Sequence, residues 1–218
     1  MDYGSMLGDA FAYAKDAVVG KWKQWALLII ATILLCIPLL GYTLKVFRGE
    51  KPAPEVTGWG TLIIDGIKYF IVSIIYAIPS IIVLFATIGA GIIAYVLNPA
   101  AILSIAGGVL VGLIIFLIVA IITSLFATIG IIRFARTGSM GEAFNFGGIL
   151  ETIGKIGWGS YILALIVIII VQVVIALIIS LLNVIPALAI IVEIIFIAPI
   201  AIFEARYLCQ VYDSAGTV

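Results

Sequence analysis

The chain has 218 residues, of which 65% are hydrophobic and only 10% charged, with eleven basic and eleven acidic side chains. A soluble domain is about half apolar and about one quarter charged, so a water-soluble globule could not hide this much apolar surface. The composition therefore predicts a chain embedded in a lipid bilayer, and its formal net charge of zero excludes a basic surface for nucleic acid.

The sequence also argues against an enzyme. It contains no histidine, which excludes imidazole bases and histidine metal ligands. Its two cysteines, Cys36 and Cys209, are too few for a disulfide framework or a four-cysteine zinc site, and we expect both to be free thiols. Phosphate-binding glycine loops and nucleophile-elbow motifs are missing. We therefore expect no catalytic residues, no metal and no cofactor.

Three segments share one pattern in which an acid is followed four residues later by an aromatic side chain, and about a dozen residues on by a glycine and a lysine; they are 9–21, 55–68 and 142–155. Apolar residues recur in each at helical spacing, which predicts three amphipathic helices at the membrane surface. Their interfacial anchors would be Lys21, Trp22, Trp59, Lys68, Lys155 and Trp158.

The pattern divides the chain into three parallel pseudo-repeats within one membrane domain, 1–218, with units at about 5–48, 54–136 and 139–212. The second and third units close with Arg133 and Arg206, and the first closes with Lys45 and Arg48. The first unit is the shortest.

The first apolar run, Trp25–Leu44, allows two interpretations. It is either a single span with the N-terminus outside, or a re-entrant hairpin that turns near Pro38 and Gly41. Two legs of about 12 residues reach only about 18 Å each, enough to dip into a bilayer but not to cross it twice. The lysines before the run favour the re-entrant interpretation, because cationic segments stay on the cytoplasmic side.

Four later apolar runs are each long enough to span a bilayer: about Tyr69–Val96, Ala101–Ile132, Trp158–Leu182 and Ala187–Phe203. The turns inside the two pairs carry no charge, whereas basic residues gather between the pairs. The runs therefore predict two hairpins with neutral tips outside and charged bases inside. The expected fold is an all-α membrane bundle in the cell membrane, with four full spans, a short first membrane segment, three interfacial helices and a cytoplasmic C-terminus.

Several segments together resemble a known family: Gly41–Glu50, Pro54-Glu55, Trp59-Gly60, Asp65-Gly66 and Ile75–Pro79, with later pieces Phe144–Phe146, Gly157–Tyr161 and Gln210–Asp213. They are similar to the archaeal and bacterial membrane proteins grouped as domain of unknown function four-thousand-thirteen. The resemblance covers most of the chain. It implies a polytopic membrane protein and brings no established activity, ligand or catalytic residue.

Small residues at Ser104, Gly108 and Gly112 lie four apart on one helical stripe, a spacing that permits close contact between helices. The stripe could pack within one chain or between subunits.

Glu193 is an acid deep inside an apolar run, where a carboxylate needs a partner. If the last hairpin turns near Asn183, Gln172 lies at the same depth on the neighbouring helix, which predicts an intramembrane Glu193–Gln172 pair. The pair would serve as an interhelical clasp or as a proton or cation relay, and the clasp is the more common use of such groups.

Together these features favour a non-enzymatic scaffold or accessory subunit that self-associates or joins other membrane-protein subunits in the bilayer. The alternative is a small-solute or ion transporter or channel that uses the Glu193–Gln172 pair.

Overall fold

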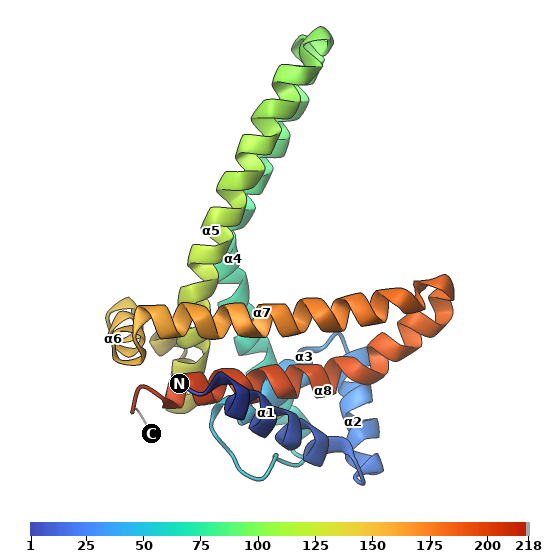
Figure 1. Ribbon diagram of the computed structural model, residues 1–218, viewed down its shortest axis with the longest axis vertical. Helices are drawn as coiled ribbons and strands as arrows, with labels where there is room; N and C mark the ends of the chain where they lie inside the picture. Colours follow the sequence, from blue (N-terminus) through green and yellow to red (C-terminus); the bar gives the residue numbers. More distant parts are fainter. Residues whose placement is uncertain (217–218) are drawn as a thin grey trace. The chain divides into compact units, whose positions relative to one another are not determined.

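The computed structural model describes residues 1–216, and the fold is all-α as expected. Its α-helices are α1 (Tyr3–Val18), α2 (Trp22–Ile33), α3 (Ile37–Phe47), α4 (Trp59–Leu97), α5 (Ile102–Thr137), α6 (Phe146–Ile156), α7 (Trp158–Ser180) and α8 (Pro186–Asp213) (Figure 1). Short 3-10 turns occupy Pro99–Ala101, Met140–Phe144 and Leu181–Val184. The described residues form two compact units, one made of residues 1–70 and 129–216 and the other of residues 71–128.

Helix α8 is at the centre of the first unit, where it contacts α1, α2, α3 and α7. The face of α1 that packs on this core carries small buried residues, Ala10, Ala14 and Ala17, which let the helices approach closely. Polar tips of aromatic side chains donate to main-chain carbonyls of neighbouring helices: Tyr207 Oη reaches Ala164 at 3.1 Å, and Trp25 Nε1 reaches Ile195 at 3.1 Å. The polar atoms of both rings are thus satisfied.

The first apolar run forms two short helices, α2 and α3, separated by a turn at Leu34–Cys36. Leu35 and Cys36 have φ angles of 56° and 60°, in the left-handed region that ends a helix. The turn is therefore earlier than the predicted position near Pro38 and Gly41. Pro38 instead occupies the first turn of α3, where its missing N–H costs nothing.

Gly41 and Gly66 mark a close, reciprocal approach between α3 and the first turns of α4. A Cβ at Gly41 would overlap the carbonyl of Leu62, and a Cβ at Gly66 would overlap the carbonyl of Ile37. Only glycine lets the two backbones meet at this distance. Gly41 therefore has a packing role within α3. It does not form the turn that the sequence predicts there.

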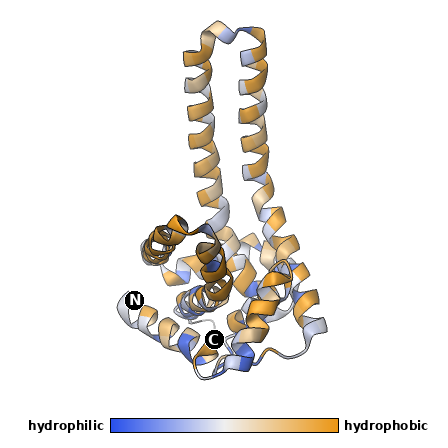
Figure 2. Ribbon diagram, turned by 90° about the vertical axis from the view of Figure 1, so that its right-hand side faces the viewer, coloured by the Kyte–Doolittle hydropathy of each residue, from blue (hydrophilic) through white to orange (hydrophobic). Residues whose placement is uncertain are grey.

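The second unit is a hairpin of α4 and α5, whose legs are hydrophobic along their length (Figure 2). Gly112 on α5 lies directly against Thr87 on α4, because a Cβ added at Gly112 would overlap the Thr87 side chain. Gly91 approaches Val109 in the same way, from the opposite leg. Towards the turn, the legs enclose a cavity of about 570 Å³.

Within residues 1–216, four helices, α4, α5, α7 and α8, are long and apolar enough to cross a membrane, and they coincide with the four apolar runs that the sequence predicts as spans. The second predicted interfacial helix is wrong as a separate element. Residues 51–58 form no helix, since Pro52, Pro54 and Gly58 (φ 71°) interrupt it, and α4 runs from Trp59 without a break at Lys68. At 1.5 Å per residue its 39 residues extend about 58 Å, which exceeds a hydrocarbon core of about 30 Å.

Candidate functional site: polar groups of the α7–α8 hairpin and the ion pairs of the first unit

Each of the four arginines pairs with an acid from another element or loop. Arg206 on α8 reaches Asp9 on α1 at 2.7 Å, and Arg206 is nearly fully buried. The remaining pairs are Arg48–Asp65 at 2.6 Å, Arg136–Asp213 at 2.6 Å and Arg133–Glu142. Sequence reasoning singled out Arg133 and Arg206 as unit ends but predicted none of these partners.

Arg136 joins three helices. Its Nε donates to the carbonyl of Phe47 at the end of α3 at 2.6 Å, and its terminal nitrogen meets Asp213 and the Cys209 thiol on α8. The guanidinium also lies 5.7 Å from the ring centroid of Tyr212, within cation–π range. These contacts use most of the donors of Arg136, so we assign it a structural role. Cys209 is buried, and both cysteines are free thiols, as expected.

Glu142 lies in the turn between α5 and α6 and accepts hydrogen bonds from Arg133 and from the Asn145 amide. These bonds hold the pKa of the Glu142 carboxyl below its usual range, because they favour its charged form. The Lys155 ammonium does the same for Glu151 on α6, at 2.8 Å. Both acids are therefore anionic at neutral pH.

Gln172 on α7 pairs with Glu204 on α8, not with Glu193: its Nε2 donates to Glu204 Oε2 at 2.9 Å. The predicted register assumed straight legs on either side of Asn183. Instead, α8 begins at Pro186, contains Pro199 and bends along its length (Figure 1), so a residue count from the tip misplaces the partner. The predicted Glu193–Gln172 pair is not formed, and the carboxylate that Gln172 contacts is that of Glu204.

Glu204 could have been found from the sequence by helical spacing. It follows Glu193 by eleven positions, about three turns, and therefore lies on nearly the same face of α8. Both carboxylates point from α8 to the side on which Gln172 is found, since Gln172 bonds one of them and lines a cavity with the other.

Glu193 lies seven residues, about 10 Å, into α8 and its side chain is exposed. It lines a cavity of about 240 Å³ between α7 and α8, with Gln172 and Ser180 as the other polar members. The remaining walls are apolar: Ile175, Ala176, Ile179 and Ile200. Within residues 1–216, Glu193 makes no hydrogen bond or ion pair.

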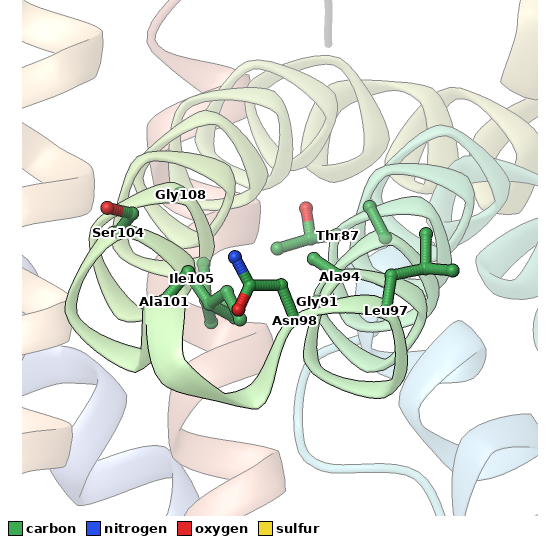
Figure 3. A pocket seen from close by; sticks show the side chains of 11 residues that line it. Thr87, Gly91, Ala94, Leu97, Asn98, Ala101, Ser104, Ile105 and Gly108 are labelled. Atoms are coloured by element: carbon green, nitrogen blue, oxygen red, sulfur yellow. The ribbon is translucent and has the colours of Figure 1, made fainter.

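The predicted packing stripe of α5 divides between two environments. Gly112 packs against Thr87, whereas Ser104 and Gly108 line the cavity near the turn of the α4–α5 hairpin. Figure 3 shows Thr87 directed from α4 towards α5 and Asn98 lying between the two legs. A Cβ at Gly108 would meet nothing within 4 Å, so this part of the stripe is open.

The six predicted interfacial anchors are all at least partly exposed. Trp22 is the most exposed of their tryptophans and stacks on Trp25 with ring centroids 5.7 Å apart. The others are Lys21, Trp59, Lys68, Lys155 and Trp158. Exposure is what an interfacial position requires, and their place at a bilayer surface stays a prediction.

The structure and the sequence define a class of protein: four long apolar helices, joined by short turns and polar segments, make this an integral helical membrane protein. Residues 25–184 match the family described as "Protein of unknown function (DUF4013)", and the chain belongs to this family. This confirms the resemblance found in the sequence. No curated protein and no solved structure matches the chain.

Proposed function

We propose that the protein is a non-enzymatic membrane scaffold or accessory subunit, and that the α7–α8 hairpin is one of its assembly surfaces. The observation that carries this proposal is Glu193, a carboxylate within a candidate span whose own chain leaves it exposed. A charged side chain facing lipid costs about 2.5–3.5 kcal/mol even on the mildest scale. A protein surface that covers Glu193 removes this cost.

The proposal is tested with a photocrosslinking residue in place of Ile197, one helical turn from Glu193. The matched control is Ile191, which is also exposed and lies on the face of α8 opposite Glu193, about 3 Å from it along the helix axis. We expect irradiation of intact membranes to yield a discrete protein adduct from the Ile197 variant and none from the Ile191 variant. If both variants crosslink only lipid, and the gently extracted chain is monomeric, the scaffold function is rejected.

The alternative function, transport of a small solute or ion, is favoured by one observation. Gln172 bonds Glu204 and also borders the Glu193 cavity, so polar groups follow one another along the inside of the hairpin. Such a series can pass protons or cations. Flux into vesicles that contain the purified protein, abolished in Glu193→Gln, would establish this function instead.

In either case we expect the first membrane segment, α2 and α3, to enter the bilayer from the cytoplasmic side and return to it. The charged ends of the long helices and the C-terminus would lie on that side of the cell membrane.

A further inference from the structure

We propose that the cavity beside Glu193 receives a lysine or arginine side chain from a transmembrane helix of another protein. This inference rests on the proposed scaffold function and names the chemistry of the partner. The site consists of Glu193, Gln172 and Ser180 together with the apolar walls of the cavity between α7 and α8.

The hydrogen-bonding groups of the cavity favour an occupant that donates hydrogen bonds. Gln172 Nε2 donates to Glu204, and Ser180 Oγ donates to the carbonyl of Leu177 at 2.7 Å, so neither satisfies Glu193 in the structure. The groups left to face an occupant are mostly acceptors: the Glu193 carboxylate, the Gln172 carbonyl oxygen and the lone pairs of Ser180, beside the second N–H of the Gln172 amide. An ammonium or guanidinium group supplies several donors and a positive charge at once.

The shape of the site agrees with a long basic side chain. Three isoleucines, Ile175, Ile179 and Ile200, form the apolar side of the 240 Å³ cavity, and the Glu193 carboxylate lies on its polar side. Lysine and arginine side chains match this arrangement of apolar and charged groups, because each has an aliphatic stem followed by a cationic head. The stem would lie against the isoleucines while the head meets the carboxylate.

The two helices that border the cavity supply no cation to it. No lysine or arginine occurs between Lys155 and Arg206, a stretch that contains all of α7 and most of α8. All four arginines are already paired with acids. A second copy that docked through the same face would set Glu193 against another Glu193. The partner is therefore a different membrane protein.

The test uses the full chain in phospholipid vesicles with a synthetic leucine–alanine transmembrane peptide that carries one lysine about 10 Å from the end of its apolar segment. A matched peptide has leucine at that position. Association is measured by energy transfer between a dye on the peptide and one on the N-terminal amine of the protein. We expect the lysine peptide to bind about ten-fold more tightly than the leucine peptide.

Glu193→Gln should abolish this preference, while Glu151→Gln, which removes an exposed acid on α6, should leave it intact. Glu193→Lys should reverse the preference towards a peptide that carries glutamate in place of lysine. Equal binding of the lysine and leucine peptides, or a preference that survives in Glu193→Gln, would overturn the inference.

The outcomes also separate this inference from the scaffold function. If Ile197 crosslinks a protein but the lysine peptide has no advantage, the scaffold function stands and the basic partner is wrong. If cations cross vesicle membranes without any peptide, and Glu193→Gln stops them, the cavity serves transport and both proposals are rejected.

Discussion

Arg206 on α8 donates a hydrogen bond to Asp9 on α1 at 2.7 Å, although 197 positions separate them in the chain. Asp9 opens the first predicted unit and Arg206 closes the third. Arg133, which closes the second unit, pairs with Glu142, which opens the third. Arg48 ends the first unit and pairs with Asp65 of the second. The cation that ends each predicted unit thus forms an ion pair with an acid of the following unit, and the cation that ends the third unit pairs with an acid of the first.

Asp9→Asn should destabilise the protein by about 2 kcal/mol. Removal of one partner of a buried ion pair lowers the free energy of unfolding by about 3–5 kcal/mol. We expect a smaller loss here because the Asp9 carboxylate is half-exposed to solvent. Arg206 stays buried and loses its counter-charge, which is the cause of the loss. Thermal unfolding in mild detergent measures the effect.

Asp16→Asn is the matched control, because Asp16 is exposed on the same helix and forms no ion pair in the described part of the chain. The double variant Asp9→Asn with Arg206→Met should regain part of the lost stability, since it removes the uncompensated charge. Equal losses in the Asp9 and Asp16 variants would show that the pair contributes nothing.

Gly112→Ala should disrupt the α4–α5 hairpin, whereas Gly108→Ala on the same stripe should not. A methyl group at Gly112 would overlap Thr87, and overpacking of this kind costs about 1–3 kcal/mol. A methyl group at Gly108 meets open space, and alanine favours a helix by up to about 1 kcal/mol over glycine. Unfolding midpoints of the two variants in detergent give the comparison. Similar shifts in both would contradict the packing assigned to Gly112.

The apolar helices could be predicted from the sequence because they depend on composition. The side-chain contacts between helices could not, because they depend on how the two helices are aligned along their axes. The four long apolar runs were recognisable because three of them contain no charged residue and the fourth contains only Glu193. The Gln172–Glu204 bond was missed because a residue count along straight legs cannot include the bend of α8 or the 3-10 turn at its tip. The turn at Leu34–Cys36 carries no glycine or proline, so no local signal distinguished it from the Pro38–Gly41 region.

Acid should weaken the α5–α6 connection through Glu142. Its pKa is lower in the folded protein than the usual value of about 4.3, so the Arg133–Glu142 pair stabilises the fold fully above about pH 5. This contribution is lost as the pH falls through the lowered pKa and the carboxylate takes up a proton. Glu142→Gln should therefore be less stable than the native chain at pH 7, and the difference should shrink as the pH falls through the lowered pKa of Glu142.

Unfolding midpoints recorded from pH 7 to pH 3 provide this measurement. Glu50→Gln serves as the control, because Glu50 is exposed and its carboxylate forms no ion pair within residues 1–216. A gap between the native and Glu142→Gln chains that is constant over the whole pH range would show that the effect is not electrostatic.

Ser5→Cys, in a background in which Cys36 and Cys209 are replaced by serine, should resist a membrane-impermeant maleimide in intact cells and react after permeabilisation. Helices α2 and α3 extend only about 18 Å and about 16 Å, so neither crosses a hydrocarbon core of about 30 Å by itself. Basic residues stand at both ends of the pair, Lys21 and Lys23 at its start and Lys45 and Arg48 at its end, which favours the cytoplasmic side for both ends.

Ala100→Cys in the same background is the positive control, because it lies in the uncharged turn of the α4–α5 hairpin and should react in intact cells. Reaction of Ser5→Cys in intact cells would place the N-terminus outside. The segment Trp22–Phe47 would then have to cross the bilayer despite its break at Leu34–Cys36, with Lys21 and Lys23 on the side that the charge bias disfavours. If Ser5→Cys is protected in intact cells, the N-terminus is on the cytoplasmic side. The cations of α1–α3 and the Arg206–Asp9 pair then lie on the same side of the bilayer, in agreement with the contact between α1 and α8.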